Sequence, residues 1–99
     1  MNPLLREIHS RWDAIFCALL DGDDVAPAQL LRTEGMMEAA VLAGVAEEAE
    51  VLAALQERYH AACGRSLEDE FGTQWSVLFP FPQLPAFARR APVYPSTSD

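Results

Sequence analysis

Residues 36–63 read MMEAAVLAGVAEEAEVLAALQERYHAAC and are the most strongly patterned part of the chain. The stretch is rich in Ala, Leu and Glu and contains no Pro, which favours helix because these side chains lose little rotamer freedom there. Its large apolar residues recur at about the 3.6-residue period of a helix. They are Met37, Val41, Val45, Leu52, Leu55 and Tyr59. The pattern predicts an apolar stripe that other parts of the chain must cover.

Gly44 decides whether this stretch is one helix or two. Acidic residues follow it closely, and acids collect in the first turn of helices because the helix dipole favours negative charge there. These residues are Glu47, Glu48 and Glu50. We therefore predict a tight turn at Gly44–Val45 and a new helix from about Ala46 to Cys63. A single helix that runs through Gly44 is the alternative.

A first helix is predicted from about Pro3 to Leu20. Asn2 is a good N-cap, and proline suits the first helical turn, where its missing N–H costs nothing. Gly22 and the aspartates beside it favour the end of the helix. The apolar stripe follows spacings of three and four, with Phe16 and Leu20 widening it. Its positions are Leu5, Ile8, Trp12, Ile15 and Leu19.

A second helix is predicted to begin near Pro27 and to continue towards Gly44. Gly35 lies inside it and weakens it by roughly 1 kcal/mol relative to Ala. Thr33 offers an alternative, because threonine is a good N-cap and could start a fresh helix at Glu34. The apolar positions of this helix are Leu30, Leu31, Met37 and Val41.

A short fourth helix is predicted from Leu67 to about Phe71. Ser66 followed by Asp69 nearly matches a capping box, in which the two residues bond to each other's backbone N–H. Residues 73–79 can be helix or extended chain, because periodicity does not separate the two over so short a run.

The composition changes at Pro80, and five of the seven prolines lie between residues 80 and 95. Prolines this dense forbid regular helix. Aromatic and Leu residues alternate with them, and burying one Phe gains roughly 1.5 to 3 kcal/mol. We therefore predict that residues 79–87 lie as a fixed extended strap over the helices, in the same chain or in a second copy. A free proline-rich ligand that awaits a receptor is the alternative.

The chain is thus divided into a helical domain over residues 1–79 and an extended Pro-rich tail over residues 80–99. The tail is expected to pack on the domain, with its last residues frayed. The predicted fold is all-α. It is a small antiparallel three-helix arrangement with a short fourth helix and an extended C-terminal strap rich in Pro and aromatic residues.

The charge is unevenly distributed along the chain. Residues 1–70 carry fourteen acidic residues and five Arg, a net charge of −9, whereas residues 71–99 carry a net charge of +1. Binding of nucleic acid through its phosphates needs clustered positive charge, so no nucleic-acid partner is expected through a basic patch. The acidic body allows docking to a basic protein surface, imitation of nucleic acid by acids spaced along one surface, or solubility alone.

A cytoplasmic location and no membrane partner are expected. The start of the chain lacks the features of a signal peptide, and no apolar run approaches the ~20 residues that a membrane span needs. In the cytoplasm, Cys17 and Cys63 should be reduced and act as small core residues.

One pattern has the spacing of metal ligands. Glu57, His60 and Cys63 follow one another at intervals of three, and His9 with Asp13 could contribute if the helices meet. Di-iron bundles need such a motif on each of two helices, and this chain has one. His60 and Cys63 are also the only local base and nucleophile, without signs of a strained, exposed thiol. We therefore expect no catalysis, metal or cofactor, with a small helical metal-binding or enzymatic bundle as the alternative.

The leading functional hypothesis is a non-catalytic cytoplasmic protein-interaction module, such as an adaptor, an anti-activator or a small chaperone. The 51% apolar composition is high for so small a bundle, so some of the surplus is expected to meet another protein or a second copy, in a homodimer. Adaptable and aromatic residues are the types most often found at interfaces, although any one of them can instead be core. The candidates are Trp12, Phe16, Met36, Met37, Trp75, Phe79, Phe81 and Phe87.

Overall fold

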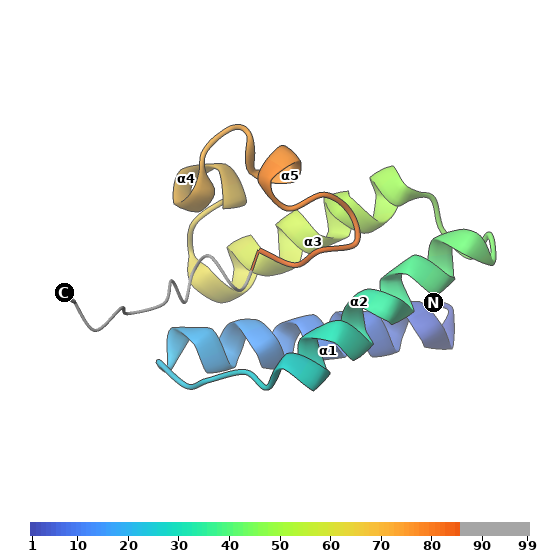
Figure 1. Ribbon diagram of the computed structural model, residues 1–99, viewed down its shortest axis with the longest axis horizontal. Coiled ribbons are helices and arrows are strands. Elements are labelled where there is room, and N and C mark those ends of the chain that lie inside the picture. The colour runs from blue at the N-terminus through green and yellow to red at the C-terminus, as the bar shows by residue number, and fades with distance from the viewer. Residues whose placement is uncertain (86–99) are drawn as a thin grey trace, which may run out of the picture.

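The computed structural model describes residues 1–85, which form five helices and no strand (Figure 1). The fold is therefore all-α, as predicted. In chain order the elements are α1 (Pro3–Leu20), α2 (Pro27–Leu42), α3 (Glu48–Cys63), α4 (Leu67–Phe71) and α5 (Trp75–Leu78). Helix α1 packs against both α2 and α3, and α4 connects α3 to α5.

Helix α1 supplies the centre of the core. Asn2 caps it as predicted, with its Oδ1 accepting the N–H of Leu4 at 2.7 Å. The prediction that Cys17 is a core residue was wrong, because Cys17 is exposed. Successive residues point in different directions around a helix, so Cys17 faces outward although Phe16 beside it is buried. The buried stripe of α1 is Ile8, Trp12, Ile15, Phe16 and Leu19, each at most 6% exposed.

Trp12 and Met37 join α1 to α2. Both side chains are buried, and the indole N–H of Trp12 donates to the sulfur of Met37 at 3.4 Å. A thioether is a weak acceptor, but a buried donor without any partner would cost about 1 to 3 kcal/mol. The contact therefore fixes the two helices together at a polar point inside an apolar core.

Helix α2 is continuous, so the alternative break at Thr33 does not occur. The Thr33 hydroxyl donates to the carbonyl of Gln29, one turn back, at 2.8 Å, and does not cap a new helix. Leu31 was placed on the apolar stripe but is 64% exposed. Leu30 and Met37 of the same predicted stripe do face the core.

The chain turns at Gly44, as predicted, and the alternative of one long helix is wrong. Gly44 has a φ of +73°, and the Val45 N–H donates to the carbonyl of Ala40 at 2.9 Å. This left-handed glycine with a bond back into the last turn is the Schellman motif that commonly ends helices. Helix α3 begins at Glu48, slightly later than predicted, because Glu47 precedes it as the capping residue.

The remaining helices follow local signals. Ser66 caps α4 as predicted, with its hydroxyl oxygen accepting the N–H of Asp69 at 3.0 Å. The undecided region, residues 73–79, contains the single helical turn of α5. Trp75 at its start is 5% exposed and belongs to the core.

A row of aromatic rings connects α1 to the segment that follows α5. Phe16 meets Tyr59 of α3 edge to face, with ring centroids 5.1 Å apart. Phe71 of α4 lies 6.2 Å from Tyr59 and 5.7 Å from Phe79. Tilted and edge-on arrangements at these distances are favourable. The row therefore anchors the beginning of the C-terminal tail.

Residues 79–85, the strap, return from α5 over the helices of the same chain (Figure 1). Leu84 and Pro85 are buried, and the Leu84 N–H donates to the carboxylate of Glu34 on α2 at 2.8 Å. The predicted docking is thus found within the chain for these residues. The remaining residues, 86–99, including Phe87, lie outside the described part of the structure.

The strap was predicted to be extended along its whole length, but it contains a turn. The Gln83 N–H donates to the carbonyl of Pro80 at 2.8 Å and closes a turn. This turn allows both Phe81 and Leu84 to pack against the core. Alternation of Pro and apolar residues predicts which side chains are buried, but it does not predict where the backbone turns between them.

Replacing Leu84 by Ala should lower the free energy of unfolding by about 2 to 4 kcal/mol, because the change leaves a cavity at a buried site. Urea denaturation measures this quantity. Leu78 is 62% exposed, so Leu78→Ala is the control and should cost less than about 0.5 kcal/mol. A loss at Leu84 no larger than that at Leu78 would show that the strap does not stabilise the fold.

Gly44→Ala and Gly35→Ala should change stability in opposite directions. Alanine at Gly44 must adopt a left-handed conformation, at a cost of roughly 1 to 2 kcal/mol. Gly35 lies inside α2, and a Cβ there would meet nothing within 4 Å. Alanine at Gly35 should therefore stabilise by about 0.5 to 1 kcal/mol. Thermal unfolding followed by circular dichroism tests the pair, and stabilisation by Gly44→Ala would contradict the turn described above.

Candidate functional site

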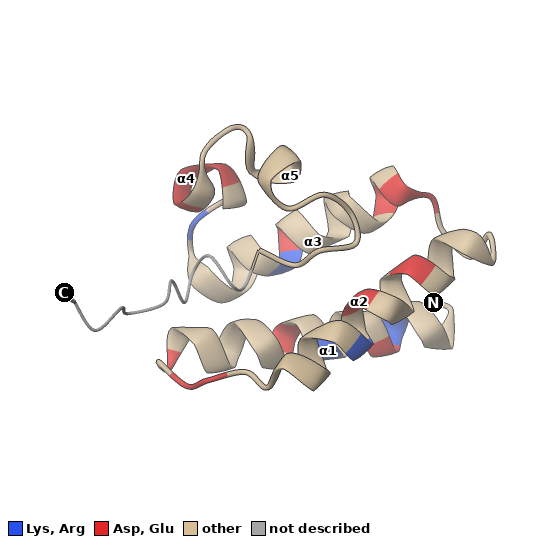
Figure 2. Ribbon diagram, viewed as in Figure 1, with Lys and Arg blue, Asp and Glu red and all other residues tan. Residues whose placement is uncertain are grey.

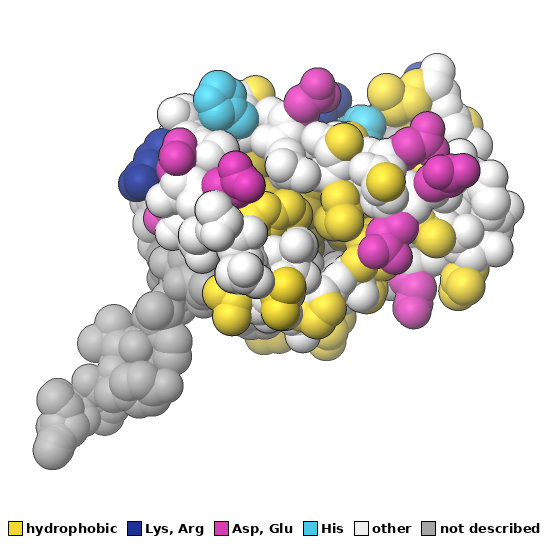
Figure 3. All heavy atoms as spheres, turned by 90° about the horizontal axis from the view of Figure 1, so that it is seen from above, with side chains coloured by type: hydrophobic (Ala, Val, Ile, Leu, Met, Phe, Trp, Pro, Cys, Tyr) yellow, Lys and Arg dark blue, Asp and Glu magenta, His cyan; other side chains and the backbone are white. Residues whose placement is uncertain are grey.

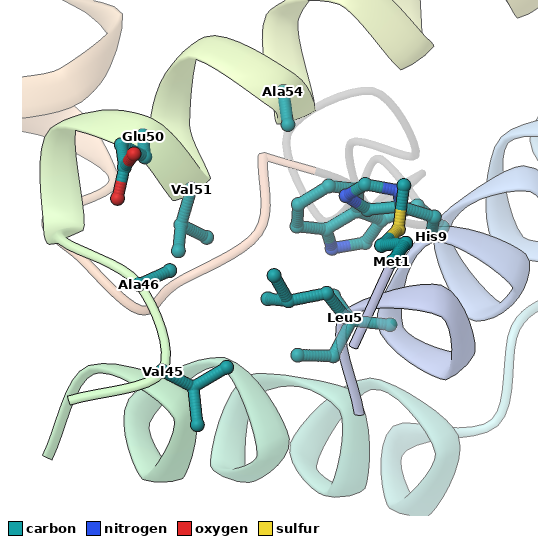
Figure 4. A pocket seen from close by; sticks show the side chains of 10 residues that line it. Met1, Leu5, His9, Val45, Ala46, Glu50, Val51 and Ala54 are labelled. Carbon is teal, nitrogen blue, oxygen red and sulfur yellow. The ribbon is translucent and has the colours of Figure 1, made fainter. Parts of the chain in front are cut away.

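An apolar pocket lies between the first half of α1, the α2–α3 turn and the first half of α3, and we call it the α1–α3 pocket (Figure 4). Its volume is about 180 Å³. A dry apolar cavity of about 150 Å³ holds a benzene molecule, so this pocket is large enough for one aromatic ring. The apolar wall consists of Met1, Leu5, Ile8, Trp12, Val45, Ala46, Val51 and Ala54.

Small side chains keep this space open. Ala46 in the turn and Ala54 on α3 both line the pocket and are partly buried. Figure 4 shows them across the space from Leu5 of α1. A larger residue at either alanine position would reach into the volume, so the pocket depends on these two positions remaining small.

His9 places a polar ring in the wall of the pocket. The imidazole stacks on the indole of Trp12, with centroids 5.1 Å apart and planes at 25°. Its Nδ1 atom is buried and has no hydrogen-bond partner within residues 1–85. Burial lowers the pKa of His9 from 6.5, and Arg58 lowers it further, while Asp13 and Glu57 raise it. Because the lowering effects win, the imidazole is neutral at pH 7.

Acidic side chains border the pocket on the α3 side. Glu50 lines it, and Glu47 and Glu48 line a hollow beside it at the α2–α3 turn. A carboxylate oxygen of Glu50 accepts the Glu47 N–H at 2.8 Å, which ties Glu50 to the start of the helix. No Lys or Arg is among the described residues that line either space. The α3 side of the rim is therefore negative.

The surface outside the pocket also combines acidic and apolar side chains. Figure 3 shows acidic side chains interspersed with hydrophobic ones over the helices. Figure 2 shows acidic residues on α1, α2, α3 and α4, with few basic residues among them. The acidic groups are thus spread over several helices. Those next to the pocket differ from the others because they border an apolar space.

The predicted interface residues fall into three groups. Four are in the core of their own chain, at most 5% exposed, as the alternative interpretation allowed: Trp12, Phe16, Met37 and Trp75. Three are partly buried: Met36, Phe79 and Phe81. Phe87 lies outside the described residues. Of the described candidates, only Trp12 lines the α1–α3 pocket.

The sequence did not predict the pocket itself. Its walls come from segments that are far apart in the chain. Taken separately, each segment has the sequence pattern of an ordinary helix or turn. His9 was considered only as a metal ligand, and Glu50 only as a signal for the start of a helix. The only sequence signal for the pocket was the presence of small residues, Ala46 and Ala54, beside large apolar ones. Many helices show that pattern without forming a pocket.

The metal-binding alternative gains no support from the described residues. No group of three or more His, Cys, Asp or Glu side chains is placed to hold an ion there. Glu57 and His60 line an open hollow with Gln56, and Cys63 packs against the core. The same part of the chain contains no helix that is long and apolar enough to cross a membrane.

Comparison of the chain with protein-family models, with curated proteins and with solved structures found no match. The chemistry of the α1–α3 pocket follows from its own side chains. They include no serine, threonine, cysteine or lysine that His9 could activate as a nucleophile. An apolar volume with one neutral imidazole and one carboxylate is suited to binding.

His9→Gln should make stability less dependent on pH below about 6.5. Because the pKa of His9 is lowered in the folded state, the unfolded chain takes up a proton first as pH falls. The stability contribution is complete above the unfolded pKa and is lost as pH falls through the folded pKa. Melting temperatures of both proteins between about pH 7.5 and pH 5 test this. The melting temperature should fall more steeply in the wild type, and equal slopes would contradict a partly buried, neutral His9.

Proposed function

We propose that this chain is a non-catalytic protein-interaction module whose α1–α3 pocket holds an apolar anchor side chain of a partner protein. The observation that supports this is an apolar pocket of about 180 Å³ with an acidic rim. A few anchor side chains in well-packed pockets carry most of the binding energy of an interface. A leucine or an aromatic side chain has the right size for this volume.

The partner segment is proposed to be basic. Glu47, Glu48 and Glu50 place negative charge on one side of the pocket, and the whole chain has a net charge of −8. Complementary charge speeds encounter and disfavours wrong partners. An amphipathic helix with an apolar anchor and basic flanks provides both features. An adaptor, an anti-activator or a small chaperone in the cytoplasm would use such a surface.

A homodimer stays a prediction with weaker support. The apolar stripes of α1 and α3 are covered within the chain, as shown by Phe16 and Leu55 at 0% exposure. A second copy could cover exposed apolar side chains such as Val77 and Leu78 on α5, which are 69% and 62% exposed, or Leu31 and Leu42 on α2. Two chains with a charge of −8 also repel each other.

Binding of a designed peptide tests the proposal. A helical peptide with a central tyrosine or leucine and flanking lysines should bind, and its affinity should fall as salt is added because ions screen the charges. Ala54→Leu fills the pocket and should weaken binding by about tenfold or more. Isothermal titration calorimetry measures both effects.

The control is Ala53→Leu, because Ala53 is exposed on the same helix and lines a different hollow. It should leave the affinity within about twofold of the wild type. A second control peptide carries glutamate in place of lysine and should not bind. Equal binding of the lysine peptide to the Ala54→Leu and Ala53→Leu proteins would contradict the proposed site, provided that circular dichroism shows both variants folded.

A further inference from the structure

His9 leaves a hydrogen-bonding group unused in the wall of the α1–α3 pocket. The flat side of the imidazole rests on Trp12. Its Nδ1 atom is buried without a partner, and Nε2 makes no hydrogen bond with the described residues. Figure 4 shows His9 on the α1 side of the pocket, across the apolar space from Glu50. The two polar groups of the pocket are therefore separated by the volume that an occupant would fill.

The burial of Nδ1 decides which nitrogen carries the proton. A neutral imidazole has one N–H and one lone pair. A buried N–H without an acceptor is more costly and rarer than a buried lone pair without a donor. The favoured tautomer therefore carries its proton on Nε2. Nε2 makes no hydrogen bond with the described residues and, unlike Nδ1, is not fully buried, so its N–H is accessible to an incoming group.

We infer that His9 determines which anchor the pocket accepts, by donating its Nε2–H to an oxygen on the occupant, so that a partner's tyrosine is preferred to phenylalanine or leucine. The inference rests on the proposed function, in which a partner's side chain fills the pocket. The aromatic ring of tyrosine would lie between Leu5 and Val51, which are apolar wall residues. Its hydroxyl oxygen would then accept the hydrogen bond from His9.

Other anchors fit these groups less well. The tryptophan indole N–H only donates, so it cannot accept the proton that His9 offers. Phenylalanine and leucine fill the volume but leave the Nε2–H without a partner once water is displaced, which costs affinity. An acidic anchor could accept the bond, but it would be repelled by Glu50 at the rim and by the net charge of −8.

Two small molecules test the inference without a known partner. p-Cresol and toluene are the side chains of tyrosine and phenylalanine, and they differ only by the hydroxyl. In titrations of the isotope-labelled whole chain followed by NMR, both should shift the amide signals of Val51 and Ala54. p-Cresol should bind about three- to tenfold more tightly, the range expected from one net hydrogen bond.

Two variants isolate the imidazole. His9→Phe keeps a ring that can stack on Trp12 but has no N–H, so it should still bind toluene and lose the preference for p-cresol. His9→Gln retains an N–H donor and should recover part of the preference. A preference that survives in His9→Phe, equal or weaker binding of p-cresol to the wild type, or no binding of either probe would each overturn the inference.

The lysine-flanked peptide, made with either tyrosine or phenylalanine at its centre, separates this inference from the proposed function. If both peptides bind equally, the assignment to His9 fails while the interaction module stands. If p-cresol is preferred to toluene but neither peptide binds, the assignment to His9 is supported and the pocket takes a free phenolic compound instead of a protein anchor.

Discussion

The packing of α2 and α3 against two sides of α1 is the constraint on which the rest of this structure depends. Trp12 of α1 meets Met37 of α2, and Phe16 of α1 meets Tyr59 of α3. A chain of this length buries only about 60 to 65% of the surface that it exposes when unfolded, and most of its core residues lie on α1 and on the two helices that cover it. The cover is less complete at the beginning of α1, where Leu5 is only partly buried. The α1–α3 pocket lies at that end.

The start of α3 links the fold to the charge of the site. Glu47 and Glu50 form the hydrogen bond that begins the helix, and the same side chains place negative charge beside the apolar space. Acids at this position also interact favourably with the helix dipole. The acids that start the helix are therefore also the acids that make this side of the pocket negative. Substitution of either acid would change both properties, whereas the two alanine positions of the wall change the space alone.

What the sequence predicted well was local. The cap at Asn2, the turn at Gly44 and the cap at Ser66 each depend on backbone geometry within a few residues, and these signals placed the helices correctly. The inward face of α2 could not be predicted in the same way, as Leu31 shows. Periodicity gives the width of an apolar stripe, but the packing angle against a neighbouring helix decides which edge of the stripe is covered. The pocket is harder still to predict from local signals, because it lies where three segments that are separate in the sequence leave space between them.

The bond between Leu84 and Glu34 joins residues that are 50 positions apart, so the strap is held by a contact distant in sequence. The contacts of α1 with α2 and α3, through Met37 and Tyr59, do not involve the strap. Detachment of the strap would break its contacts, expose Phe81 and Leu84 to water and leave the contacts among the three long helices in place. Amide hydrogen exchange at Leu84 would proceed through this detached state, whereas exchange in the middle of α1 requires global unfolding.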